Sequence, residues 1–146
     1  MQLYFLRHGE AVFKGAPDYQ NDSLRPLTAE GMKKVKLSVK GMKKLELDFD
    51  LILTSPYLRA KQTAEIVAFS LKSKSKLKIS KELIPGVPLT RRVNEIKKKY
   101  TGCEEILLVG HEPDLSRDIS ALVSGSPDFS IALKKGSLCK LSLDSL

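Results

Sequence analysis

The sequence predicts a three-layer α/β/α domain built around a mostly parallel sheet. Short apolar runs alternate along the chain with longer amphipathic segments, the order in which strands and crossover helices follow one another in such folds. The N-terminal run from Leu3 to Leu6 is apolar at every position, as in a strand that is buried on both faces. No repeat, linker or low-complexity tract divides the chain, so we expect residues 1–146 to form a single domain.

The first half of the chain predicts two helices around a second strand. One helix begins at 28–31 and ends before Asp48, because apolar residues recur there at spacings of three and four. A strand follows at about 50–54, and a second helix begins at Pro56, a residue well suited to the first turn. The apolar stripe of the first helix is Met32, Val35, Val39 and Met42, and that of the second is Tyr57, Ala60, Ala64, Val67 and Leu71.

The second half continues the alternation and ends in a pair of edge strands. Residues 72–76 form a loop and 77–79 a short strand; 82–88 are irregular, since they contain two prolines and a glycine. A helix at 90–99, a strand at 105–109 and a helix from Pro113 come next. The tail alternates apolar and polar residues at 131–133 and 138–143, around Lys135 and Gly136, which predicts two strands at the sheet edge.

The composition limits the class of protein and the cellular compartment that we expect. Hydrophobic residues make up 42% of the chain and charged residues 29%, as in globular proteins. No apolar stretch approaches the roughly 20 residues of a membrane span, and Met1 leads directly into the first strand with no signal peptide. We therefore expect a cytoplasmic protein with no membrane partner, in which Cys103 and Cys139 are reduced.

The net charge of +8 raises the question of a nucleic-acid partner. The excess lysines are concentrated in predicted helices and loops, with few aromatic residues between them on which bases would stack. We expect these lysines to be solvated and the protein to have no nucleic-acid partner. A positive field still attracts phosphorylated substrates.

Polar residues follow three of the predicted strands at the point where each strand ends. Arg7, His8 and Gly9 follow the first strand, Arg59 comes shortly after the second, and His111 follows the strand at 105–109. Open α/β sheets bind their ligands at the carboxyl ends of the strands. The sequence thus brings two arginines and both histidines of the chain to one edge of the sheet.

This set of residues suits phosphoryl transfer. An arginine grips two oxygens at once and keeps its charge, while an imidazole attacks phosphorus once its other nitrogen is held by a hydrogen bond. We therefore predict Arg7 and Arg59 as clamps, His8 as nucleophile, an open N–H at Gly9 for the anion, and a protonated His111 as a third cation. Two histidines without clustered carboxylates or thiolates make no metal site, and no cofactor is expected.

Four segments together resemble the histidine phosphatase superfamily, and within it the short phosphohistidine phosphatases of the SixA type. They are 6–10 (LRHGE), 25–28 (RPLT) followed by Gly31, 55–64 (SPYLRAKQTA) and 109–111 (VGH), in this order. The resemblance implies a phosphohistidine intermediate on His8 and a phosphate pocket of Arg7, Arg59 and His111. It also implies that Arg25 lines that pocket.

The resemblance is weakest at the general acid. Larger members of the superfamily carry a glutamate in an insertion between the second and third motifs, whereas this chain has a brief segment at 81–86. Glu82 is the catalytic candidate there by position, and Glu10 and Asp18 compete with it. A phosphohistidine substrate releases imidazole, a better leaving group than an alkoxide, so an acid is less necessary for it.

Three functions follow from these patterns. The first is a metal-independent phosphatase that acts on a phosphorylated protein carrying phosphohistidine, or on a small phosphoramidate. The second is a phosphomonoesterase of small metabolites, and the third is a phosphate-binding module without turnover. An intact nucleophile at His8 argues against the third, since binding alone does not require it.

Overall fold

Five strands form one sheet in the order β3-β2-β4-β1-β5 in the computed structural model, which describes residues 1–129 and 131–146. The strands are β1 (Gln2–Arg7), β2 (Leu51–Thr54), β3 (Leu77–Ile79), β4 (Glu105–Gly110) and β5 (Leu138–Ser142). The first four are parallel, and β5 pairs antiparallel with β1. The prediction of a mostly parallel sheet is confirmed.

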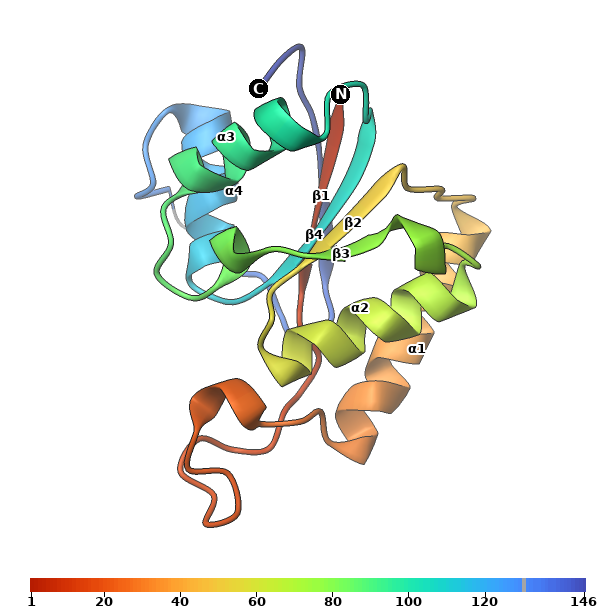
Figure 1. The fold of residues 1–146 in the computed structure, drawn as a ribbon, viewed down its shortest axis with the longest axis vertical. Coiled ribbons are helices and arrows are strands. Elements are labelled where there is room, and N and C mark those ends of the chain that lie inside the picture. Colours follow the sequence, from red (N-terminus) through yellow and green to blue (C-terminus); the bar gives the residue numbers. More distant parts are fainter. Residues whose placement is uncertain (130) are drawn as a thin grey trace.

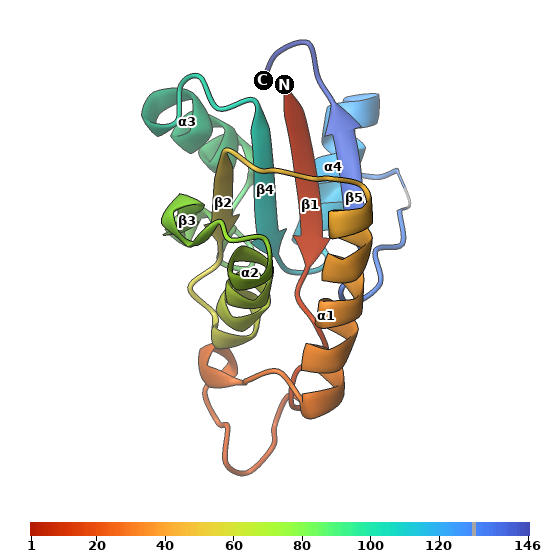
Figure 2. The ribbon, with the colours of Figure 1, turned by 90° about the vertical axis from the view of Figure 1, so that its right-hand side faces the viewer.

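Two helices cover each face of this sheet, so the fold has the three layers that the sequence predicts (Figures 1 and 2). The helices are α1 (Ala29–Lys44), α2 (Leu58–Ser70), α3 (Leu89–Lys99) and α4 (Asp114–Ser124). Helices α1 and α2 pack on one face, and α3 and α4 on the other. Within the described residues, none of these helices has the length and apolar character needed to cross a membrane.

Strand β1 lies inside the sheet and contributes to both cores. Successive side chains of a strand point to opposite faces. Tyr4 and Leu6 accordingly pack with α1 and α2, while Leu3 and Phe5 pack with α3 and α4. All four are at most 2% exposed, which explains why the run is apolar at every position.

Helix α1 begins at a side-chain cap and presents a narrower apolar face than predicted. Thr28 accepts the backbone N–H of Gly31 on its hydroxyl oxygen at 2.9 Å, which satisfies one of the free donors of the first turn. Val35, Val39 and Met42 are buried as predicted. Met32 is 37% exposed instead, because Gly31 takes the buried position in the first turn.

Helix α2 begins two residues later than predicted. Tyr57 has extended backbone angles, and its N–H donates to the hydroxyl of Ser55 at 3.3 Å, so Pro56 belongs to a turn before the helix. Ala60, Ala64 and Val67 are buried, whereas Tyr57 and Leu71 stand at the two caps and are only partly covered. The turn at 55–57 leads out of β2 into the polar edge of the sheet.

The tail forms one edge strand rather than two. Strand β5 is present, but 131–133 pair with no strand. Leu133 instead packs into the core beneath α4, and its carbonyl accepts a hydrogen bond from Arg7. The alternation of apolar residues there reflects packing against a core, which needs no neighbouring strand.

The polypeptide segment that follows β1 approaches α1 very closely at two glycines. A Cβ at Gly31 would overlap the carbonyl oxygen of Glu10, and one at Gly9 would lie 2.7 Å from a methyl group of Val35. The Glu10 carbonyl accepts the N–H of Thr28 at 2.9 Å, so the contact fixes the segment after β1 against the start of the helix.

We expect Gly31→Ala to lower the free energy of unfolding by about 1–3 kcal/mol, because the added methyl group overpacks this contact. Gly41→Ala in the same helix is the matched control, since a Cβ there meets nothing within 4 Å. It should leave stability unchanged or raise it by up to about 1 kcal/mol. Urea denaturation measures both, and equal effects of the two substitutions would contradict the tight contact.

Candidate active site

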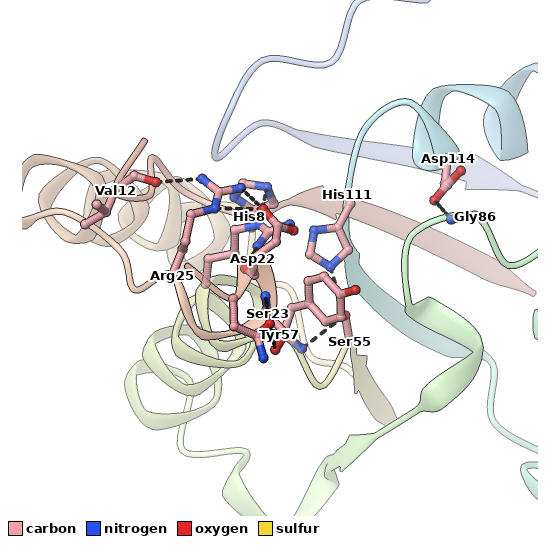
Figure 3. A network of polar contacts seen from close by, with 12 residues as sticks. His8, Val12, Asp22, Ser23, Arg25, Ser55, Tyr57, Gly86, His111 and Asp114 are labelled. Carbon is pink, nitrogen blue, oxygen red and sulfur yellow. Dashed lines mark hydrogen bonds and ion pairs between the residues drawn. The ribbon is translucent and has the colours of Figure 1, made fainter. Parts of the chain in front are cut away.

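A polar pocket of about 320 Å³ opens where β1 and β4 end. Five of the residues predicted from sequence line it together: Arg7, His8, Arg25, Arg59 and His111. Asp22, Glu112 and Lys135 also line it. Segments distant in the sequence thus converge on one site (Figure 3), and its lining includes three arginines and two lysines.

His8 is held with one ring nitrogen free of its proton. Nδ1 lies 2.6 Å from the carbonyl oxygen of Gly9 and donates its hydrogen there, so Nε2 keeps its lone pair. Nε2 accepts from Nε of Arg59 at 3.3 Å. Burial lowers the pKa of His8 to about 4, and the charges of Arg59 and Arg7 act in the same direction. The ring is therefore neutral and nucleophilic at neutral pH.

His111 faces His8 with their ring centroids 5.2 Å apart. Its Nε2 lies 2.8 Å from the hydroxyl of Ser55, which already accepts the N–H of Tyr57. Nε2 of His111 is the one acceptor within reach of that hydroxyl among the described residues, so we assign the hydroxyl hydrogen to this bond and the imidazole hydrogen to Nδ1. The pKa of His111 is lowered to about 3, mainly by burial and to a smaller degree by the charges of His8 and Arg59. His111 is thus a neutral N–H donor, and the predicted cation is not found.

Asp22, in the short 3-10 helix Asp22–Leu24, joins two of the arginines. Its carboxylate accepts from Nη2 of Arg59 at 3.1 Å and from Nε of Arg25 at 2.8 Å. Burial raises the pKa of Asp22, but the hydrogen bonds and charges of the two arginines outweigh it and hold that pKa below its ordinary value. Asp22 is ionised at neutral pH and orients both guanidinium groups.

Two buried N–H groups of the lining residues have no partner within the described residues. They are Nε of Arg7, whose Nη1 donates to the carbonyl of Leu133 at 2.8 Å, and Nδ1 of His111. Buried donors in folded proteins are almost always paired. The oxygens of a phosphoryl group accept hydrogen bonds from such donors, and they favour positively charged surroundings.

Gly9 has a different function from the one predicted. Its N–H donates to the hydroxyl of Thr63 at 3.0 Å, and that hydroxyl donates to the carbonyl of Arg59 at 2.7 Å. The N–H is therefore not open to an anion, and Gly9 does not line the pocket. It serves instead to connect β1 with α2 and to accept the hydrogen bond of His8.

None of the three candidate acids lines the pocket. Glu82 accepts hydrogen bonds from Nε and Nη2 of Arg91, each at 2.9 Å, and this hydrogen bonding keeps the pKa of Glu82 below its ordinary value. Glu10 lies 3.6 Å from Lys135, and Asp18 is exposed. The carboxylates that do line the pocket are Asp22 and Glu112. In the described part of the chain, no group of three or more His, Cys, Asp or Glu is arranged to hold a metal ion.

The family model of the histidine phosphatase superfamily (branch 1) matches residues 3–84. The chain belongs to the histidine phosphatase superfamily. The match includes the segments that carry Arg7, His8, Arg25 and Arg59, and it confirms the family predicted from sequence.

Several proteins resemble this chain over most of its length. An uncharacterized protein of Picosynechococcus sp. is 36% identical over 97% of this chain and 84% of its own. The phosphohistidine phosphatase SixA of Escherichia coli is 31% identical over 86% of this chain and 76% of its own. A solved structure of the protein histidine phosphatase SixA with tungstate superposes with a TM-score of 0.85 at 27% identity, covering 99% and 89% of the two chains. The chain is thus a SixA-type histidine phosphatase in sequence and fold.

Several residues of this histidine phosphatase site were missed by the sequence analysis. Asp22 stands three residues before Arg25, a spacing at which acid and base pair, and this spacing was an available signal. Ser55 and Thr63 lie in segment 55–64, which carries part of the family resemblance, but the sequence does not indicate their hydrogen bonds to His111 and Gly9. Glu112 also lines the pocket, and its position directly after His111 was the one signal for it in the sequence.

Both imidazole rings should remain neutral down to about pH 5. The unfolded rings take up protons near pH 6.5, whereas the folded rings do so only near 4 and 3, so protonation favours the unfolded state. The free energy of unfolding therefore falls as pH decreases below about 6.5. NMR titration of the two rings tests this directly, since the chain has two histidines. A ring that titrates near pH 6.5 would contradict the burial argument.

Proposed function

We propose that the protein is a phosphohistidine phosphatase that works through a phosphohistidine intermediate on His8. The observation that carries the proposal is the unprotonated Nε2 of a neutral, buried His8, which lies 3.3 Å from Nε of Arg59 and in the same pocket as two residues with unpaired N–H donors. Membership of the histidine phosphatase superfamily, and 31% identity to a protein named phosphohistidine phosphatase SixA, support it.

The proposed reaction has two steps. In the first, the Nε2 lone pair forms a bond to phosphorus, the P–N bond of the substrate breaks, and the departing imidazole takes up a proton from solvent. In the second, water attacks phosphorus, the bond to Nε2 breaks, and inorganic phosphate leaves with the original ring restored. The Nδ1–H bond to the Gly9 carbonyl stabilises the positive charge that develops on the ring during the first step.

Arg7, Arg25, Arg59 and His111 are proposed to bind the phosphoryl oxygens. Charge spreads over these oxygens in the transition state, and fixed cationic donors stabilise it without reorganising. Arg7 and His111 offer the two unpaired donors, and Asp22 holds the other arginines in place. Tungstate, an oxyanion, is bound in the related SixA structure, which supports an oxyanion site here. We propose that the three arginines, together with the neutral N–H donor of His111, take the place of a metal ion.

The carboxylates near the pocket favour a phosphoramidate over an ester. Asp22 is held ionised by two arginines, and Glu82 is bound to Arg91 away from the pocket, so neither is a ready proton donor. An alkoxide leaving group needs a proton more than an imidazole does. A small phosphomonoester is the second candidate substrate, because Glu112 lines the pocket and its carboxylate accepts only from Ser116 among the described residues, at 2.7 Å.

The decisive experiment compares kcat/KM for a phosphohistidine-carrying protein domain, free phosphoramidate, sugar phosphates and phosphoserine peptides, all in the presence of EDTA. We expect the P–N substrates to win by tenfold or more and brief exposure to label His8. The label should be acid-labile and base-stable.

Two variants test the roles of the site residues. His8→Ala should be inactive, and Arg59→Lys should lose about 10²-fold in kcat, because a lysine cannot reproduce the planar grip. Preference for an ester, loss of activity in EDTA, or a label on another residue would refute the proposal.

Glu112→Gln separates the two candidate substrates. With a phosphohistidine substrate, kcat should change less than threefold, because the leaving imidazole needs no help from this carboxyl. With a phosphate ester, kcat should fall by about 10²-fold, the usual contribution of a general acid. Asp114→Asn is the control, as this nearby carboxylate accepts from Gly86 outside the pocket. A loss of 10²-fold on phosphohistidine would show that this substrate also requires an acid.

A further inference from the structure

A larger groove lies beside the active pocket, between α1 and the turn at 134–137 that precedes β5. It encloses about 830 Å³, and Arg7 and Lys135 line both the groove and the pocket. Figure 2 shows α1 alongside the segment that leads into β5. The two cavities are therefore neighbours that share Arg7, a residue with one of the proposed oxyanion donors.

The groove has an apolar floor and a basic rim. Met42 and Leu138 form the floor, and Lys34 and Lys134 are exposed along the rim. Its one acidic lining residue, Glu10, is already 3.6 Å from Lys135, whereas Lys34 and Lys134 are in no ion pair within the described residues. The groove is therefore complementary to a ligand that carries negative charges beside an apolar side chain.

The walls of the groove are tied to the active site by hydrogen bonds. The hydroxyl of Ser38 in α1 donates to the carbonyl of Gly136 at 2.8 Å, and the N–H of Gly136 donates to the carbonyl of Arg7 at 3.0 Å. The groove thus has a fixed position relative to His8, the residue after Arg7. A chain bound in it would lie against Arg7 and Lys135, which also line the pocket of His8.

We propose that this groove binds an acidic segment of the phosphorylated protein, with an apolar side chain on the floor, next to the phosphohistidine that enters the pocket. This inference rests on the proposed function. The acidic segment is the feature by which the protein would distinguish its substrate from other phosphorylated proteins. A polypeptide fits better than a single-stranded nucleic acid, because the residues that line the groove include no aromatic ring for bases to stack on. Opposite charges across such a surface raise the rate of encounter as well as the affinity.

The test uses two synthetic phosphohistidine peptides that share one leucine and differ only in their flanking residues, Glu in one and Gln in the other. The wild-type protein should show about five- to tenfold higher kcat/KM for the Glu peptide at low ionic strength, and the preference should vanish at about 0.5 M salt. Lys34→Glu/Lys134→Glu should remove or reverse the preference. The same variant should hydrolyse free phosphoramidate at the wild-type rate, because neither lysine lines the pocket.

Lys97→Glu/Lys98→Glu on α3 is the matched control, since it makes the same change of charge on the opposite face of the sheet (Figure 2). An equal loss of preference in this variant would reduce the effect to net charge and overturn the proposal. Equal turnover of both peptides by the wild type would overturn the groove proposal alone. Failure to hydrolyse either peptide or phosphoramidate would overturn the proposed function, and the groove proposal with it. Inhibition by a single-stranded oligonucleotide that depends on Lys34 and Lys134, without peptide discrimination, would favour nucleic acid instead.

Discussion

The register between the parallel strands β1 and β4 is the constraint on which the site depends. Arg7 pairs with Gly110, and the N–H of His8 donates to the Gly110 carbonyl at 3.1 Å. His8 and His111 therefore leave neighbouring strands at the same level of the sheet. A shift by one residue would turn every side chain of β1 to the other face, so the two cores fix this register. Packing far from the pocket thus sets the separation of the two rings.

The sequence was sufficient for the fold because hydrophobic periodicity reports burial directly. It predicted the five paired strands, all four helices and the meeting of Arg7, His8, Arg59 and His111 at one edge. It failed where burial did not imply strand pairing, as at 131–133, which pack into a core without joining the sheet.

The sequence was less informative about hydrogen-bond partners inside the site. Glycine at position 9 suggested an open N–H, but the hydroxyl of Thr63, 54 residues away in the sequence, takes that donor. Position alone suggested Glu82 as an acid, and Arg91 in the following helix binds it instead. Such partners are decided by three-dimensional proximity between segments, which residue type and spacing do not encode.

The lowered pKa of His8 has a consequence for the lifetime of a phosphoryl group attached to it. Burial destabilises a positively charged ring, and a ring with a hydrogen on Nδ1 and a phosphoryl group on Nε2 carries such a charge. The burial that keeps Nε2 unprotonated therefore also favours departure of the ring from the proposed phosphohistidine intermediate when water attacks. A histidine in such surroundings suits disposal of phosphate to solvent, whereas a protein that stores phosphate and passes it to a second protein needs a more basic, longer-lived carrier.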